Sequence, residues 1–276
     1  MIALAFALAL ISQDIPDVCR APEGEAPDWA ACAQALPDGS PQQTFARLNQ
    51  ATEAYLDRDY GDAGRVFDRA GDFGPFESDA LYVFRADTRQ HLGRDKEATA
   101  DAEAAWRIMQ IGQALEPSPD EQAALEAQRL FLLSLVLPIL KEGRSSAFEP
   151  AFAAYRAIPV KDVEGYATQA LVLEQLGDLD GALAASLLVV KAEPANAGYL
   201  NNHCYILVRA GRPAEGLPFC EKAVQSEPEL APLRHSLASA LAGAGRCTEA
   251  ETALAEARRL EPATVLYQQS IACRAR

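Results

Sequence analysis

Three stretches of the sequence decide the fold, because they repeat one pattern at a spacing of 34 residues. They read LVLEQLGDLDGALAASLLVVKAEP (171–194), YILVRAGRPAEGLPFCEKAVQSEP (205–228) and SALAGAGRCTEAETALAEARRLEP (239–262). Each stretch ends in proline, and glycine, leucine and two small residues keep the same spacing. These columns are Gly177, Gly211 and Gly245; Leu173, Leu207 and Leu241; Ala170, Cys204 and Ala238; and Ala182, Gly216 and Ala250. Several columns in phase indicate a repeat architecture.

The pattern within one period predicts a helical hairpin. We expect first helices at 163–176, 197–210 and 231–244, and second helices at 179–191, 213–225 and 247–259. The glycine fits the turn between them, because it ends a helix at little conformational cost. The proline stops the second helix and starts the link to the next hairpin. The small residues mark where the two helices approach closely.

This pattern resembles the tetratricopeptide repeat family, whose period is 34 residues. The best unit has small, small, apolar, small and proline positions at the family's offsets, namely Cys204, Gly216, Cys220, Ala223 and Pro228. It departs from the family at Leu200, which replaces the first aromatic residue. The resemblance implies an all-α fold, a right-handed superhelix of antiparallel helix pairs, with three regular units over 163–262.

Outside the regular units the pattern is weaker, and residues 44–160 are interpreted as degenerate hairpins of the same kind. One spans about 44–77, and another starts at 79 with a second helix running toward Leu115. The apolar stretch RLFLLSLVLPIL (129–140) predicts a buried helix over 119–142, kinked or ended near Pro138, with a partner helix at 145–158. Its apolar core is too short for a membrane span.

The two ends of the chain are expected to differ from the repeats. Residues 13–43 predict an irregular N-terminal arm, and residues 263–276 predict a capping helix. Val265, Leu266 and Ile271 are expected to cover the last repeat.

The first residues, MIALAFALALI, form an uncharged apolar run followed by SQDIPD. This length is typical of the apolar region of a signal peptide, assigned here to residues 1–12. No Lys or Arg precedes the run, so either the amino terminus supplies the positive charge or the true start lies upstream. A buried N-terminal helix is the alternative. A lipoprotein is disfavoured, because PDVC lacks small residues before Cys19. We therefore expect a periplasmic or secreted protein.

The six cysteines are even in number and all follow the proposed signal peptide, as expected for disulfides in an oxidising compartment. Cys204 and Cys220 lie at a similar level in the two helices of one hairpin, within disulfide range. Cys247 opens the last second helix, and Cys273 lies late in the expected capping helix. Cys19 and Cys32 remain as a local pair. The alternative is a redox or metal site, but there is no CxxC and no His–Cys cluster with ligand spacing.

Composition argues against several functions. The formal charge is −14 and the pI about 4.7, so the chain repels phosphate backbones and nucleic acid is not expected as a partner. No nucleophile elbow, HExxH or phosphate loop occurs, GDFG (71–74) is interpreted as a turn, and the three histidines are far apart in sequence. We expect no enzymatic activity, no cofactor and no bound metal.

The family resemblance implies that the first helices of the hairpins line a face that binds a protein or peptide. Carried across, the partner-binding residues are Tyr55, Glu174, Asn201, Tyr205, Arg209 and His235. Arg209 is the only obvious cation there, so a clamp for a terminal carboxylate is not expected. The leading hypothesis is a non-catalytic envelope scaffold with an unidentified protein or peptide partner. The alternatives are an enzyme-associated, assembly or regulatory role located in 79–160, and a self-associating structural protein. The oligomeric state is left open.

Overall fold

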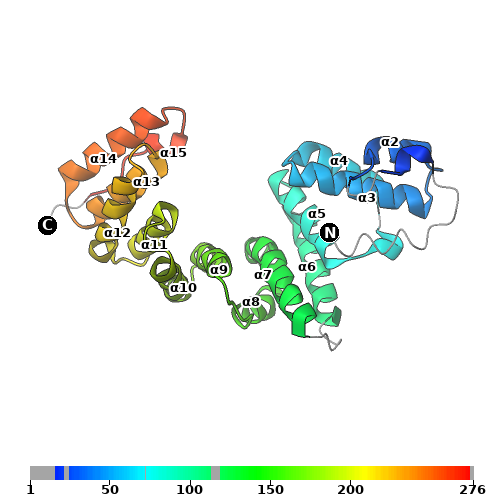
Figure 1. Ribbon diagram of the computed structural model, residues 1–276, viewed down its shortest axis with the longest axis horizontal. Helices are drawn as coiled ribbons and strands as arrows, with labels where there is room; N and C mark the ends of the chain where they lie inside the picture. The colour runs from blue at the N-terminus through cyan, green and yellow to red at the C-terminus, as the bar shows by residue number, and fades with distance from the viewer. Residues whose placement is uncertain (1–15, 22–24, 72, 113–118, 274–276) are drawn as a thin grey trace. The chain divides into compact units, whose positions relative to one another are not determined.

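The computed structural model describes residues 16–21, 25–71, 73–112 and 119–273, and these contain helices and no strands (Figure 1). The proposed signal peptide, residues 1–12, lies outside the described residues. The chain forms two compact units, which meet between Ile158 and Pro159. The unit up to Ile158 is called unit 1 here, and the unit from Pro159 is called unit 2.

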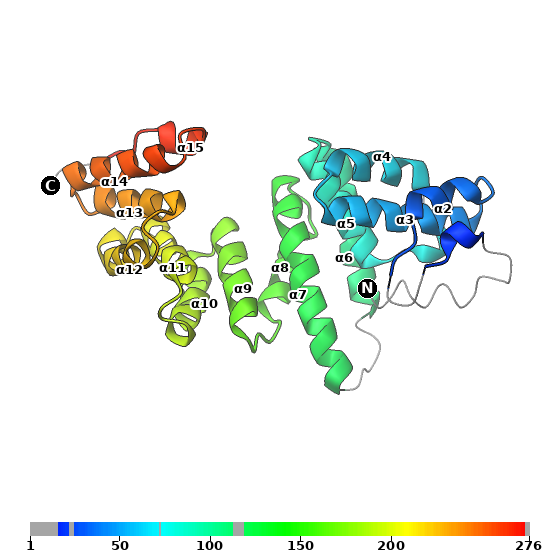
Figure 2. The ribbon, with the colours of Figure 1, turned by 45° about the horizontal axis from the view of Figure 1, so that its top comes forward.

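Unit 2 consists of three helical hairpins of nearly equal length. They are α9 (Val163–Gln175) with α10 (Leu179–Ala192), α11 (Ala197–Arg209) with α12 (Pro213–Ser226), and α13 (Ala231–Gly243) with α14 (Cys247–Leu260). Each predicted helix is confirmed, with ends within one residue of those expected. The glycines between paired helices have φ values of 82°, 73° and 81°, a left-handed conformation that favours glycine after a helix. Figure 2 shows α13 and α14 lying side by side.

Small residues let the paired helices approach closely, as the repeat predicted. Cys204 of α11 has no exposed surface, and Gly216 of α12 is buried against it. A Cβ atom added to Gly216 would lie 3.1 Å from the backbone oxygen of Cys204. The contact therefore leaves little room for a side chain.

The end of the chain differs from the predicted capping helix over 263–276. Helix α15 covers only Val265–Gln268, and Cys273 lies in a non-helical segment that forms a disulfide with Cys247. Helix α14 rises about 20 Å between Cys247 and its end, whereas a helix from Val265 to Cys273 would return only about 12 Å. An extended chain gains about 3.3 Å per residue. The residues after α15 are therefore extended, which lets Cys273 reach Cys247 at the far end of α14.

The residue that covers the last repeat also differs from the prediction. Val265 and Leu266 are 73% and 52% exposed, whereas Tyr267 is buried and packs against Ala231 and Ala257. Only Ile271, of the three residues expected to act as a cap, packs against the core of unit 2. Because α15 is so short, the side chain that points inward is Tyr267.

Unit 1 also contains three hairpins, with unequal helices. They are α3 (Pro41–Leu56) with α4 (Tyr60–Ala70), α5 (Asp79–His91) with α6 (Asp95–Gly112), and α7 (Pro119–Glu142) with α8 (Phe148–Arg156). A short 3-10 helix, η3 (Gly74–Phe76), precedes α5. The long second helix predicted toward Leu115 is described as far as Gly112. Helix α7 has the predicted bounds and continues through Pro138 rather than ending there.

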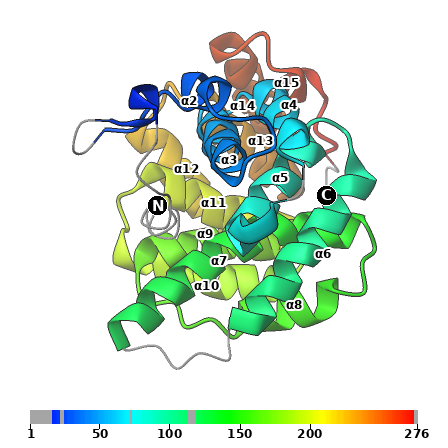
Figure 3. The ribbon, with the colours of Figure 1, turned by 90° about the vertical axis from the view of Figure 1, so that its right-hand side faces the viewer.

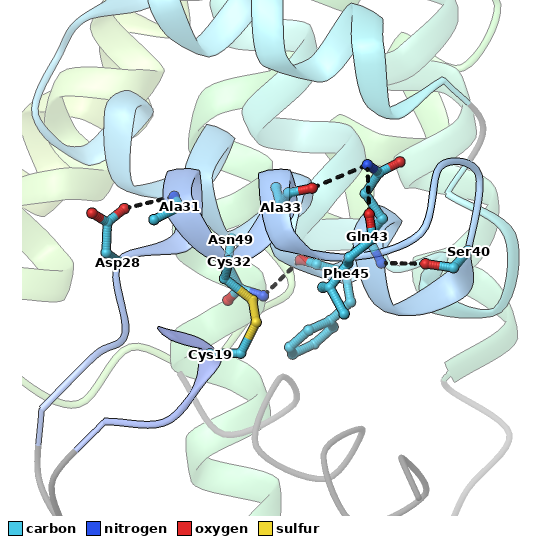
Figure 4. Close-up of a disulfide and its surroundings, with 10 residues drawn as sticks. Cys19, Asp28, Ala31, Cys32, Ala33, Ser40, Gln43, Phe45 and Asn49 are labelled. Atoms are coloured by element: carbon cyan, nitrogen blue, oxygen red, sulfur yellow. Dashed lines mark hydrogen bonds between the residues drawn. A yellow bond between two sulfur atoms is a disulfide. The ribbon is translucent and has the colours of Figure 1, made fainter. Parts of the chain in front are cut away.

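The N-terminal arm is more ordered than the sequence predicted. It contains a 3-10 helix, η2 (Asp17–Cys19), and a short helix, α2 (Trp29–Ala35), which packs beside α3 (Figure 3). The Cys19–Cys32 disulfide joins η2 to α2, and Asp28 caps α2 through the backbone N–H of Ala31 (Figure 4). Seven residues give a weak periodic signal, and this helix depends on its cap and its disulfide.

Helix α7 carries the longest apolar stretch among the described residues. By length and composition, its segment Gln122–Glu142 could cross a membrane. In its tested apolar window, 39% is buried inside the protein. A core helix satisfies the same criterion. Leu132, Leu133, Val136, Leu137 and Leu140 are fully or almost fully buried, as predicted for a buried helix.

Candidate partner-binding face

The first helices of the unit 2 hairpins, α9, α11 and α13, place five of the predicted binding residues on one side of each hairpin. We call Glu174, Asn201, Tyr205, Arg209 and His235 the helix-A face. Glu174 lies in the last turn of α9 and Arg209 ends α11, and their side chains form an ion pair between adjacent repeats. The carboxylate is 12% exposed, whereas the guanidinium is 47% exposed. The pair therefore presents mainly the cation to solvent.

Tyr205 and Asn201 lie on the same helix as Arg209. The Arg209 guanidinium is 6.0 Å from the centre of the Tyr205 ring, within cation–π range. Interactions with Tyr205, and then with Glu174, raise the pKa of Arg209 further. The Oδ1 atom of Asn201 is buried and accepts no hydrogen bond from the described residues. A buried acceptor without a donor is energetically unfavourable.

His235 has a more structural environment than the other residues of this face. Its ring packs at 5.2 Å from the ring of Tyr267, the residue that covers the last repeat. Burial lowers the pKa of His235, which favours the neutral imidazole at pH 7. His235 therefore joins the helix-A face to the C-terminal segment.

Tyr55 belongs to unit 1 and is largely buried, unlike the open position that the family resemblance implied. Its ring stacks on Phe84 at 4.7 Å, and its hydroxyl donates to Oδ2 of Asp87 at 3.0 Å. Burial, followed by the charge of Asp87, raises the pKa of Tyr55. Tyr55 thus packs α3 against α5 and lies in a different unit from the helix-A face.

The region 79–160, where an alternative function was considered, contains a buried ionic cluster. Asp101 of α6 is 4% exposed and accepts hydrogen bonds from Arg85 and Arg89 of α5 at 2.6 to 2.9 Å. The Arg85 guanidinium also lies 4.2 Å from the centre of the Phe73 ring. Because these charges pair with one another, the cluster holds α5 to α6. The part of the chain that the structure describes contains no group of three His, Cys, Asp or Glu side chains that could hold a metal.

The sequence did not single out the hydrogen bond between His203 and Ser186. Nδ1 of His203 in α11 lies 2.8 Å from Oγ of Ser186 in α10, and both side chains are buried. One signal in the sequence could have indicated this bond. Ser186 and His203 are polar residues at otherwise apolar positions, and their separation of 17 residues places them on two adjacent helices.

Stacked helical hairpins with a polar face along their first helices define the α-solenoid class of repeat proteins. Residues 207–272 match the model of the tetratricopeptide repeat family. These residues run from the end of α11 to the segment after α15, and this part of unit 2 is similar to tetratricopeptide repeats. No curated protein matches the sequence.

Solved structures support the same fold. A tetratricopeptide repeat protein from Parabacteroides merdae is similar over 87% of both chains, with 14% identity and a TM-score of 0.58. A chain of the APC/C hetero-tetramer Cut9–Hcn1 is similar over 87% of this chain, with 14% identity and a TM-score of 0.54. The match covers 44% of that longer chain. At these identities the likeness shows the fold alone.

Proposed function

We propose that this protein is a non-catalytic scaffold of the cell envelope that binds a protein or peptide on the helix-A face of unit 2. Tetratricopeptide repeats are in general protein–protein interaction modules. The observation that supports this face most strongly is the group formed by Glu174, Asn201, Tyr205 and Arg209 across two repeats. It combines an exposed cation with an aromatic ring.

These groups suit an extended peptide better than a small molecule. Arg and Tyr contribute strongly to binding free energy at protein interfaces. An acidic or carbonyl group of a bound segment could accept from Arg209, and an apolar group could pack on the Tyr205 ring. Because Glu174 already pairs with Arg209, its carboxylate fixes the guanidinium in place before binding and reduces the entropy lost on association.

Location in the cell envelope is supported by two independent features. The apolar start of the chain is typical of a signal peptide. All six cysteines form disulfides, which persist in oxidising compartments.

Site-specific photo-crosslinking in cells tests the binding face. A photo-reactive residue at Gln175, which is exposed beside Glu174, should crosslink to a partner. The same residue at Ala255, which is exposed on α14, is the matched control. Tyr205→Ala with Arg209→Ala should reduce the Gln175 crosslink, whereas Arg246→Ala, which removes an exposed ion-paired arginine elsewhere, should not. Equal crosslinking at both positions, or no effect of the double substitution, would contradict the proposal.

Cell fractionation with thiol labelling tests the compartment separately. In protein from its native cells, we expect envelope localisation and no free thiol by mass spectrometry after alkylation. Six free thiols, or recovery in the cytosol, would contradict the envelope assignment while leaving the binding face open.

A further inference from the structure

Unit 2 has a second candidate site on the opposite helices of its hairpins. A pocket of about 350 Å³ opens between α10 and α12. Its apolar lining comes from Leu183 and Leu187 of α10, Leu207 of α11 and Phe219 of α12, and its polar lining includes His203 and Arg212. We call it the α10–α12 pocket. None of its lining residues belongs to the helix-A face.

Two leucines of α10 at this pocket are open to solvent. Leu187 is 39% exposed and Leu188 is 45% exposed. Large apolar side chains left exposed next to a concave surface are typical of a binding site. At this size the pocket accommodates a single side chain better than a cofactor.

The polar part of the pocket has a defined hydrogen-bonding pattern. Nδ1 of His203 lies 2.8 Å from Oγ of Ser186, and that oxygen also lies 3.2 Å from the backbone oxygen of Leu183. A hydroxyl has one proton, which goes either to Leu183 or to Nδ1, and the tautomer of His203 follows from that choice. Nε2 of His203 is accordingly a hydrogen-bond acceptor or a donor. Ser186 does not line the pocket, so the ring presents to it the side away from Nδ1.

The neighbours of His203 support its neutral form. Burial lowers the pKa of His203, and the charge of Arg212 lowers it further. Phe219 packs edge-to-face against the imidazole at 4.6 Å, which fixes the plane of the ring. Arg212 binds Glu215 through Nε and Nη2, which leaves Nη1 for another acceptor.

We propose that the α10–α12 pocket binds the side chain of a tyrosine from a partner protein. Its ring would lie among the leucines and Phe219. Its hydroxyl would hydrogen-bond to Nε2 of His203, as donor or as acceptor, and its oxygen would accept from Arg212. The other candidates match this pattern less well. An indole N–H donates but accepts nothing, and a phenyl ring does neither. A carboxylate is opposed by Glu215, which lines the pocket and already pairs with Arg212, and an ammonium is repelled by Arg212.

Nuclear magnetic resonance on the full chain with ¹⁵N-labelled histidine tests this proposal. The probe is N-acetyl-L-tyrosinamide, and the matched probe without the hydroxyl is N-acetyl-L-phenylalaninamide. We expect the tyrosine compound to shift the Nε2 resonance of His203 and to bind about five- to tenfold more tightly, the effect of one or two hydrogen bonds. Equal binding of the two compounds, or no shift at His203, would overturn the proposal.

A variant that fills the pocket avoids disturbing buried groups. Ala184 lines the pocket and is exposed, so Ala184→Phe should abolish the response to the tyrosine compound without unfolding unit 2. Ala255→Phe, at an exposed alanine of α14, should leave it intact. Tyr205→Ala with Arg209→Ala should also leave it intact, which separates this pocket from the helix-A face. An unchanged response in Ala184→Phe would place binding elsewhere and reject the pocket.

Discussion

Units 1 and 2 keep the same contact inside each hairpin but differ in how one hairpin is joined to the next. Ala51 and Ala63 are buried in α3 and α4, as are Cys204 in α11 and Gly216 in α12. In unit 2 the links have equal length and a proline in phase. In unit 1 the links vary in length, and aromatic and ionic contacts fill the space between successive hairpins.

The link between α4 and α5 illustrates this difference. Phe73 is buried there, 6.4 Å from the ring of Phe67 and 4.8 Å from the ring of Tyr82, and Arg85 lies over it. The corresponding links in unit 2 are joined by simpler contacts, such as the bond from Lys222 to the backbone oxygen of Pro194 at 2.7 Å. A constant link allows one pattern to repeat, whereas a variable link needs a small core of its own.

The largest effect should come from breaking the ionic cluster of unit 1. Asp101→Asn removes the charge that Arg85 and Arg89 share in a buried site. We expect a loss of about 3–5 kcal/mol, because two guanidinium groups lose their buried partner. Hydrogen exchange should rise first in α5 and α6, while unit 2 keeps its protection.

An exposed ion pair of the same unit provides the control for this substitution. Asp62 pairs with Arg65 at 2.9 Å, with side chains 37% and 65% exposed. Asp62→Asn should change stability by about 0–1 kcal/mol. Equal effects of the two substitutions would show that burial of Asp101 is not what makes unit 1 depend on it.

The next largest effect should come from the disulfide inside the middle hairpin of unit 2. Cys204 and Cys220 are fully buried and 16 residues apart in sequence. Replacing both by alanine should cost about 3 kcal/mol, the value expected for a loop of this length. Denaturant unfolding followed by circular dichroism measures the loss. Replacing Cys19 and Cys32 should instead affect mainly η2 and α2, and a global loss there would contradict the local role assigned to that disulfide.

The helix bounds of unit 2 could be predicted because glycine, proline and small residues recur in phase. The Cys204–Cys220 pair followed from the levels of the two residues in one hairpin. Cys247–Cys273 was predicted from a capping helix that does not extend to Cys273, and Cys19–Cys32 was the pair left over. Helix α2 could not be predicted, since seven residues carry little periodicity and its order depends on Cys32. The end of the chain was misread as helix because sequence periodicity does not report the distance between Cys247 and the last turn of α14.

The candidate site was predicted as positions rather than as interactions. Glu174 and Arg209 were assigned to one face, but their pairing depends on the stacking of α9 against α11. Tyr55 was assigned to the same kind of face, yet Phe84 covers it. His203 was considered as one of three histidines far apart in sequence, although its hydrogen-bond partner, Ser186, lies on the preceding helix.

Two glycines offer a test of how rigid each unit is. A Cβ on Gly216 would meet the backbone oxygen of Cys204 at 3.1 Å, whereas a Cβ on Gly64 would meet the end of the Leu92 side chain at 2.6 Å. Leu92 is 41% exposed and can rotate away. We expect Gly64→Ala to stabilise unit 1 by about 0.5–1 kcal/mol through helix propensity. Gly216→Ala should destabilise unit 2 by about 1–2 kcal/mol through overpacking. Thermal unfolding measures both, and the same sign for the two would contradict this contrast.

The smallest expected effect is a dependence of unit 2 on pH. Burial, and for His203 also Arg212, lowers the pKa values of His203 and His235 below the ordinary 6.5. The unfolded chain therefore binds more protons than the folded chain as the pH falls through 6.5. The free energy of unfolding of unit 2 is therefore greatest above pH 6.5 and should decrease as the pH falls toward the lower folded pKa values. One pKa unit between the folded and unfolded states corresponds to about 1.4 kcal/mol. Hydrogen exchange in α10 to α12, measured between pH 7 and 5.5 and corrected for intrinsic rates, should show this decline. His203→Gln should reduce its slope. An unchanged slope in that variant would mean that His203 does not contribute, and that the neutral imidazole is not what the packing of Ser186 and Phe219 requires.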